Sequence, residues 1–253
     1  KSADIIVGGK GDDIITGGDG DDIITGGLGD DTINVDKGTD TIADLGGSSG
    51  GESDILVVSK DAIAKATVKV SFTATSSTVN NAANDVTKAI ISTDTDGATI
   101  DMSSAQGVYT LTGGDGVDKL TGSAGADTIN AGKGDDEITV AAAGKADTDV
   151  MDGGDGTADV LKLSTGKHTF GDDNKLKNIE KIETDSSGSE VILSAQKEAL
   201  EITGGDGVDK ITGGEGVDTI NAGKGDDEIT VAAAGKADTD VMDGGDGTAD
   251  VLK

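Results

Sequence analysis

The sequence predicts an all-β protein whose chain coils into a parallel β-roll, or β-helix, solenoid. Three observations predict this fold class: a glycine-rich pattern of nine residues recurs in tandem, a stretch of fifty residues is repeated almost unchanged, and short strand-like runs lie between the repeats. A repeat of this size cannot bury its apolar face alone. Neighbouring units must therefore stack and share a continuous core.

The tandem pattern begins near the N-terminus. Residues 8–16, 17–25 and 26–34 read GGKGDDIIT, GGDGDDIIT and GGLGDDTIN, and all fit Gly-Gly-x-Gly-x-Asp-x-U-x, where U is a large aliphatic residue. Glycines supply the positive φ of a tight turn, and the last three positions alternate, so each unit predicts a six-residue turn and a three-residue strand. The U residues Ile15, Ile24 and Ile33 should point inward, and Ile14, Ile23 and Thr32 outward.

The stacking of these units predicts a metal site. Two units complete one coil, so Asp13 should face Asp31, and Asp4 should face Asp22. Carbonyl and carboxylate oxygens then converge between stacked loops, which suits Ca²⁺ with its six to eight oxygen ligands better than the strictly octahedral Mg²⁺. We expect on the order of six to twelve calcium ions. A flexible linker has no reason to hold an aliphatic residue at every ninth position, and acidic residues after each glycine run would repel a phosphate.

These motifs closely resemble the repeats-in-toxin (RTX) family. The resemblance implies a right-handed parallel β-roll, calcium-dependent folding outside the cell, and export from a Gram-negative bacterium by a type I system.

The composition agrees with metal-dependent folding. The chain has 253 residues, 49 acids against 20 bases, a net charge of −29, no Cys, Pro or Trp, and three aromatic residues. Charge repulsion and a thin apolar core predict a largely disordered metal-free chain and a folded calcium form. Nucleic acid is excluded as a partner because clustered cations are missing, and no apolar run is long enough to enter a membrane.

Five segments follow from the pattern. They are an RTX block at 1–58, a Thr-rich β spacer at 59–112, a second block at 113–162, a second β spacer at 163–203 and a third block at 204–253. The first block ends in degenerate units that place Asp40 and Asp54 at the metal position and Ile42 and Leu56 at U.

The spacers read as strands or wider coils without metal loops. In the first spacer, residues 66–75 alternate with Val68, Val70, Phe72 and Ala74 on one face. Strands are also predicted at 86–91, 99–102 and 108–111, and a loop at 80–85. Short helices at 60–66 and 194–200 are alternatives.

The second and third blocks are near duplicates. Residues 204–253 repeat 113–162 with four differences, at positions 120/211, 123/214, 124/215 and 126/217. In the second block, residues 140–146 interrupt the pattern, and a bulged unit then places Asp159 as ligand and Leu161 inward. Structural modules duplicate more readily than catalytic sites. The second copy stops within a unit, so we expect the chain to be a fragment of a longer protein.

The expected metal-binding positions contribute side-chain or main-chain oxygens. They are Asp4, Gly8, Lys10, Asp12, Asp13, Gly17, Asp19, Asp21, Asp22, Gly26, Leu28, Asp30, Asp31, Asp40, Asp54, Gly113, Asp115, Val117, Asp118, Asp127, Asp135, Asp136, Asp155, Asp159, Gly204, Asp206, Val208, Asp209, Asp218, Asp226, Asp227, Asp246 and Asp250.

Catalytic residues are not predicted. The single histidine, His168, stands in a polar stretch and is expected on the surface. One imidazole without a second His or Cys forms no zinc site, and no nucleophile motif accompanies it. We therefore expect a protein that is not an enzyme.

Two functions remain open. The composition and the alternation of blocks with Thr-rich spacers resemble RTX-type bacterial surface-layer (S-layer) proteins, which implies a secreted, self-assembling structural protein at the cell surface, with further copies of itself as partner and a cell-surface polysaccharide bound outside these residues. The alternative is the secretion and folding block of a larger adhesin, toxin or extracellular hydrolase.

Overall fold

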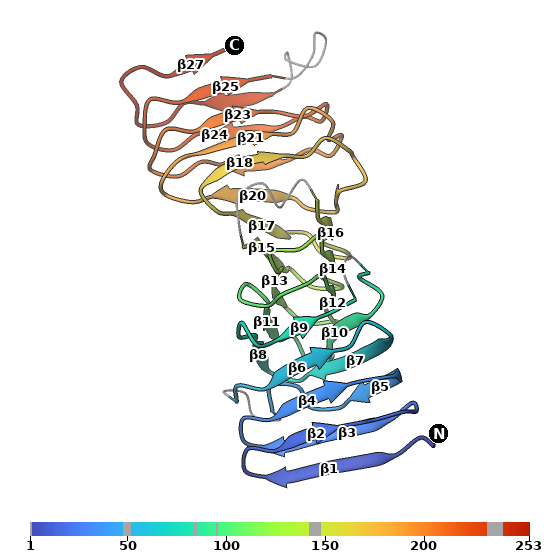
Figure 1. The fold of residues 1–253 in the computed structure, drawn as a ribbon. Helices are drawn as coiled ribbons and strands as arrows, with labels where there is room; N and C mark the ends of the chain where they lie inside the picture. The colour runs from blue at the N-terminus through green and yellow to red at the C-terminus, as the bar shows by residue number, and fades with distance from the viewer. Residues whose placement is uncertain (1, 48–51, 83–84, 95, 142–147, 232–239) are drawn as a thin grey trace. The chain divides into compact units, whose positions relative to one another are not determined.

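The computed structural model describes residues 2–47, 52–82, 85–94, 96–141, 148–231 and 240–253. The described residues form 27 β-strands and no helix. The chain divides into two units, residues 1–134 and 135–253, and each is a stack of parallel strands (Figure 1).

The first unit contains three columns of parallel strands. The longest column runs in the order β1 (Ile5–Lys10), β3 (Ile23–Leu28), β5 (Gly38–Ile42), β7 (Ala62–Val68), β10 (Ala89–Thr93), β12 (Thr110–Thr112) and β14 (Thr128–Asn130). The others are β2 (Ile14–Thr16), β4 (Thr32–Val35), β6 (Ile55–Val58) and β9 (Val79–Asn80), and β8 (Ser71–Thr73), β11 (Thr99–Asp101) and β13 (Lys119–Thr121).

The second unit is built in the same way. One column contains β15 (Glu137–Val140), β17 (Val160–Leu163), β20 (Lys181–Thr184), β22 (Glu201–Thr203), β24 (Thr219–Asn221) and β26 (Val241–Asp243). Another contains β18 (Gly166–Thr169), β21 (Ser189–Ile192), β23 (Lys210–Thr212), β25 (Glu228–Thr230) and β27 (Val251–Leu252). The remaining pair is β16 (Val150–Asp152) with β19 (Leu176–Lys177).

The predicted register of the nonapeptides is confirmed. Ile15 pairs with Ile33, and Ile24 lies between Ile6 and Ile42, so each unit stacks on the second unit after it. The U residues Ile24 and Ile33 are fully buried, whereas Ile14 is 82% exposed. One aliphatic residue per unit therefore builds a thin, continuous core, as the repeat requires.

The strands of the first block are not uniform in length. Strand β2 has the three residues that the pattern predicts, but β1 and β3 extend through the following glycines to Lys10 and Leu28. In these two coils the glycine pair continues the parallel ladder, with Gly9 opposite Gly27.

The first spacer continues the coil with wider turns. Ile91 pairs with Ala66, and Ile100 with Phe72, so these coils contain more residues than the nonapeptide coils. The predicted single strand over 66–75 is wrong: β7 ends at Val68 and β8 begins at Ser71. Val70 lies at the corner between two columns and is 46% exposed, because a corner breaks the alternation of inward and outward residues.

Other details of the spacers also differ from expectation. The helix at 60–66 is not formed, because β7 occupies Ala62–Val68, and residues 194–200 form turns rather than a helix. The strands expected at 86–91 and 108–111 begin later, as β10 and β12, whereas β11 agrees with the strand expected at 99–102. The expected loop at 80–85 and interruption at 140–146 lie partly outside the described residues.

His168 is a core residue, and the expectation of a surface position is wrong. Its side chain is fully buried, it pairs in register with Val191, and its Nε2 lies 2.7 Å from the carbonyl oxygen of Ser164. The polar neighbours of His168 in the sequence conceal an inward-facing strand position.

Candidate metal centre

A ladder of carboxylates runs through the stacked loops. The main-chain N–H of Asp13 donates to Oδ1 of Asp31 at 2.8 Å, and that of Asp31 donates to Oδ1 of Asp54 at 2.9 Å. On the other side of the coil, the N–H of Asp4 donates to Asp22 at 2.8 Å, and that of Asp22 to Asp40 at 3.0 Å. The predicted facing of Asp13 with Asp31 and of Asp4 with Asp22 is confirmed.

The same ladder recurs in the later blocks. In the second unit, the N–H of Asp209 donates to Asp227 at 2.8 Å, and that of Asp227 donates to Asp250 at 3.1 Å. The N–H of Asp136 donates to Asp159 at 2.7 Å, which places the bulged unit in the ladder, and Leu161 is fully buried as predicted. The extra residues in these coils do not interrupt the alignment of the sixth positions.

The second carboxylate oxygen of many ladder residues is buried without a hydrogen-bond partner among the described residues. This holds for Oδ2 of Asp13, Asp22, Asp31, Asp40, Asp159, Asp227 and Asp240. A buried, unpaired carboxylate oxygen costs free energy unless a cation or donor satisfies it. Since the oxygens recur from loop to loop, they indicate a repeated cation site.

Glycine leaves the space that such an ion needs. A Cβ atom added at Gly17 would lie 2.9 Å from Oδ2 of both Asp22 and Asp40. A Cβ at Gly8 would lie 2.5 Å from the carbonyl oxygen of Gly26 and 2.7 Å from Oδ2 of Asp13. Carboxylate and carbonyl oxygens of stacked loops therefore surround the first glycine of a unit. This all-oxygen donor set fits Ca²⁺.

Side chains alone do not complete the site. In the described part of the chain, no group of three or more His, Cys, Asp or Glu side chains is placed to hold a metal ion. Main-chain carbonyl oxygens would have to supply the remaining ligands of a calcium ion, which ordinarily takes six to eight.

Electrostatics also favour a cation in the ladder. Burial raises the pKa of Asp31, and the carboxylates of Asp13, Asp44 and Glu52 raise it further, against the lowering effect of the N–H of Asp13. Burial likewise raises the pKa of Asp40, with further contributions from neighbouring carboxylates. Buried like charges repel each other, and a divalent cation would relieve this repulsion.

The third position of the unit faces away from the ladder. Asp19, Asp115 and Asp206 make ion pairs with the lysines of the stacked loops, Lys37, Lys133 and Lys224, at 3.1, 2.9 and 2.9 Å. These side chains are exposed, so only the carbonyl groups at the third position remain available to the interior of the loop. Exposed pairs of this kind contribute little stability.

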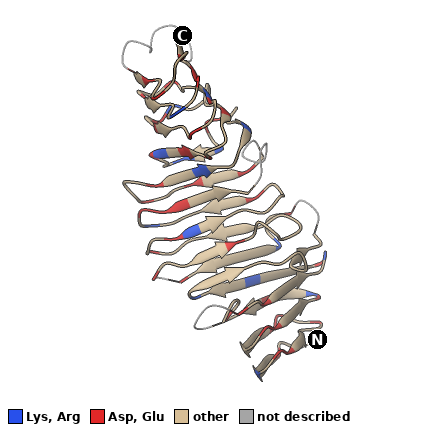
Figure 2. Cartoon of the chain, turned by 90° about the vertical axis from the view of Figure 1, so that its left-hand side faces the viewer, with Lys and Arg blue, Asp and Glu red and all other residues tan. Residues whose placement is uncertain are grey.

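The fifth position forms a second, outer ladder. Oδ1 of Asp12 accepts the N–H of Asp30 at 3.0 Å, and Oδ1 of Asp30 accepts the N–H of Ser53 at 2.8 Å. These carboxylates therefore reach the following loop, whereas those at the sixth position reach the preceding one. Across the chain, acidic residues recur from turn to turn (Figure 2).

The remaining predicted positions lie in the loops. Lys10 pairs with Leu28 beside the glycine pair, and Asp155 and Asp246 are exposed. Asp118 and Asp127 are buried and accept N–H groups from Ala98 and Tyr109, both at 2.7 Å. Gly113 and Gly204 lie against the carbonyl groups of Ala131 and Ala222 in the stacked loops.

Several ladder residues lie outside the nonapeptide units that the sequence pattern predicts. Oδ1 of Asp240 accepts the N–H of Asp218 at 3.0 Å, and Oε2 of Glu180 accepts the N–H of Asp159 at 2.8 Å. Asp240-Val-Met242 is an Asp-x-U sequence with methionine at U, and Met242 pairs with Ile220, so a signal was present. Asp44 and Glu52, which face the loop at 26–29, carry no such signal.

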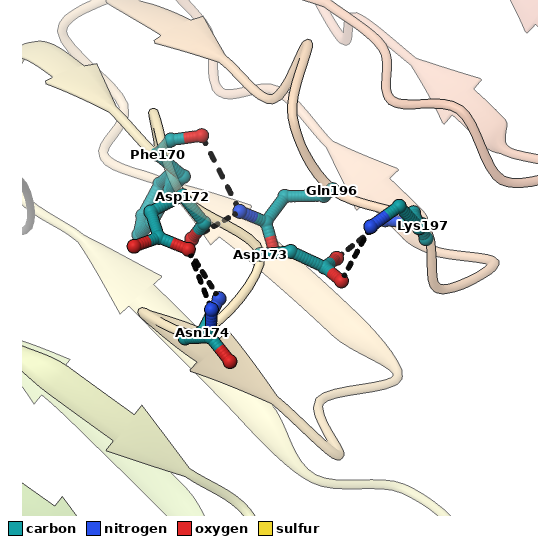
Figure 3. A network of polar contacts seen from close by, with 6 residues as sticks. All are labelled: Phe170, Asp172, Asp173, Asn174, Gln196 and Lys197. Atoms are coloured by element: carbon teal, nitrogen blue, oxygen red, sulfur yellow. Dashed lines mark hydrogen bonds and ion pairs between the residues drawn. The ribbon is translucent and has the colours of Figure 1, made fainter.

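In the second spacer, the loop at 170–174 is held by hydrogen bonds and an ion pair between protein groups (Figure 3). Nε2 of the buried Gln196 donates to the carbonyl oxygens of Phe170 at 3.3 Å and Asp172 at 3.1 Å, and Lys197 pairs with Asp173 at 3.0 Å. Asn174 donates from its main chain and side chain to Asp172. Protein groups thus hold this loop where the blocks present unpaired carboxylate oxygens.

A parallel solenoid with carboxylate ladders in its glycine-rich loops defines a β-roll of the metal-binding type. The family model described as "RTX calcium-binding nonapeptide repeat (4 copies)" matches residues 2–33, 110–141 and 201–231. The chain therefore carries RTX calcium-binding repeats over these residues. No curated protein and no solved structure matched the chain. Proteins with these repeats are typically secreted by type I systems.

No helix among the described residues is both long and apolar enough to cross a membrane.

Proposed function

We propose that this chain is a calcium-set structural solenoid of a secreted protein. The observation that carries the proposal is the series of buried, unpartnered Oδ2 atoms in the sixth-position ladder. Calcium bound there would neutralise repulsion within a chain of net charge −29 and would link each loop to the one stacked on it. Asp13, Asp22, Asp31 and Asp40, with neighbouring carbonyl groups, would hold the ions.

Calcium-dependent folding would help to make secretion one-way. A chain that folds only when calcium binds stays unfolded at the low calcium concentration of the cytosol and folds at the higher concentration outside. This supports export through a type I system and an extracellular location. The role we assign is structural rather than enzymatic.

Within this class, we propose a self-assembling S-layer subunit located at the cell surface. Support comes from the composition, from the alternation of blocks with Thr-rich spacers and from the near-duplicate third block. Calcium would rigidify each roll, and neighbouring copies would then pack into a lattice. A cell-surface polysaccharide would be bound outside these residues.

Electron microscopy of the purified full-length protein in calcium tests the assembly. We expect a two-dimensional lattice that dissolves when EGTA is added. Monomeric particles that bind calcium and fold but form no lattice would instead favour the folding block of a larger adhesin, toxin or hydrolase.

A further inference from the structure

The nine regular nonapeptide loops fall into two conformations. In one, the second and fourth positions are glycines with positive φ; these loops are 8–13, 17–22, 26–31, 131–136 and 222–227. In the other, no position has positive φ; these loops are 113–118, 122–127, 204–209 and 213–218. We call them the open and the closed loops.

The closed loops satisfy their own carboxylate. Oδ2 of Asp118 accepts the N–H of Gly114 at 2.8 Å, and Oδ2 of Asp218 accepts that of Gly214 at 2.7 Å. The same contact joins Asp127 to Ser123 at 2.6 Å and Asp209 to Gly205 at 3.0 Å. The second-position amide therefore occupies the carboxylate oxygen that a calcium ion would need.

The open loops at 8–13, 17–22, 26–31 and 222–227 leave that oxygen unsatisfied. Asp22, Asp31 and Asp227 are each 1% exposed, and their Oδ2 atoms have no hydrogen-bond partner among the described residues. Oδ2 of Asp22 faces the space at Gly17, together with Oδ2 of Asp40. Among the nine regular loops, therefore, a buried Oδ2 without a hydrogen-bond partner occurs in open loops and in none of the closed ones.

The residue at position five separates the two sets without exception. All five open loops have aspartate there: Asp12, Asp21, Asp30, Asp135 and Asp226. All four closed loops have valine or alanine: Val117, Ala126, Val208 and Val217. The three valines are 62%, 58% and 51% exposed, so burial in the core does not explain them.

The fifth-position aspartate has a direct physical effect. Oδ1 of Asp21 accepts the N–H of Thr39 at 2.8 Å, and Oδ1 of Asp226 accepts that of Thr248 at 3.1 Å. Asp135 makes the same contact with Thr157 at 3.0 Å. Each contact ties the loop to the one stacked after it and favours its open conformation. The side chains of valine and alanine cannot accept a hydrogen bond. A loop with either residue at position five is therefore not tied to the following loop, and its second-position N–H can bond to its own sixth-position carboxylate.

We propose that position five selects which nonapeptides bind calcium: loops with aspartate take the ion, and loops with valine or alanine are metal-free links. This inference rests on the proposed calcium role. The loops that begin each later block would then join the spacer to the roll without metal, and Val117 and Val208 would mark loops that bind none.

Two single substitutions in the third block, each of which removes one acidic residue, test the proposal. Asp226→Val removes the fifth-position carboxylate, and Glu215→Val removes an exposed third-position carboxylate in the neighbouring loop 213–218 as a control matched in charge. Native mass spectrometry of the full chain with CaCl₂ should count at least one ion fewer in Asp226→Val and an unchanged number in Glu215→Val. Circular dichroism in calcium checks that each variant is folded.

The reverse substitution tests whether position five is sufficient. Val208→Asp should add at least one ion to the wild-type count. If either Asp226→Val or Val208→Asp keeps the wild-type number, the proposal is overturned, since stacking on the spacer would then close the loops. If the wild-type chain itself binds no calcium, the proposed function fails instead.

Discussion

At the scale of single residues, the sixth-position aspartates combine two roles in one carboxylate. Oδ1 of Asp22 accepts the N–H of Asp4, and Oδ2 is left for an ion. The hydrogen bond to Oδ1 aligns the stacked loops, and the unpaired Oδ2 provides a ligand for a cation. This division explains why a buried acid is tolerated at every ninth position.

Asp22→Asn separates these two roles. The amide oxygen keeps an acceptor for Asp4, but the ligand charge is lost, so calcium affinity should fall about tenfold or more. Isothermal titration calorimetry with CaCl₂ measures the change, and Asp61→Asn, at an exposed position, should leave affinity unaltered. Equal affinity in the two variants would remove Asp22 from the site.

Glycine is required at the second position for a reason beyond φ. Gly9 and Gly27 have nearly the same φ, 118° and 117°. A Cβ at Gly27 would collide with the main chain of Gly9, whereas nothing lies within 4 Å of one at Gly9. Gly27→Ala should therefore destabilise the calcium-bound chain by about 1–3 kcal/mol more than Gly9→Ala does. Guanidinium unfolding in calcium provides both values, and equal losses would contradict the close packing of stacked loops.

At the scale of elements, β3 places its neighbouring isoleucines in opposite environments. Ile24 is fully buried between Ile6 and Ile42, whereas Ile23 is 47% exposed. Ile24→Ala should cost about 2–5 kcal/mol because it leaves a cavity in a thin core, and Ile23→Ala about 0.5 kcal/mol or less. Chemical denaturation in calcium compares the two, and similar losses would show that the stack does not depend on its inward column.

The elements differ in how far the sequence predicts them. The strands around Ile15, Ile24 and Ile33 follow from a repeat that fixes both turn length and register. The wider coils of the spacers do not, because corners such as the one at Val70 interrupt the alternation without a Gly or Pro to mark them. The inward position of His168 cannot be predicted for a related reason: the register of its strand with the next strand, rather than the polarity of its neighbours in the sequence, turns the side chain inward.

The candidate metal site, too, can be predicted only in part from the sequence. The facing of sixth-position aspartates could be predicted from the period alone. The opposite direction of the outer ladder, and the way Asp118 and Asp218 close on their own loops, depend on main-chain geometry that the pattern does not contain.

At the scale of the whole molecule, charge repulsion should make the metal-free chain respond to acid in an unusual direction. Burial raises the pKa of Asp40, Asp54 and Asp218 above the ordinary value. Groups with raised pKa bind protons more readily in the folded chain, so their contribution to stability is present at low pH and is lost as pH rises through the folded pKa. The exposed Asp135 and Asp226, whose pKa is lowered, act in the opposite direction, but solvent screens them.

In EGTA, therefore, acidification from pH 7 towards about 4 should increase β structure. In calcium, the same change should release ions, because protons compete for the carboxylates. Far-UV circular dichroism and calcium-electrode readings across this range check both directions. A metal-free chain that loses β structure on acidification would contradict the claim that buried, mutually repelling carboxylates destabilise the fold in the absence of calcium.

If calcium sets the fold of this solenoid, a calcium titration followed by far-UV circular dichroism will show the folding transition itself. Starting in EGTA at neutral pH, we predict a largely disordered spectrum that converts cooperatively to a β spectrum as calcium is added and reverts when EGTA is restored. A β spectrum already present in EGTA and unchanged by calcium would contradict the account.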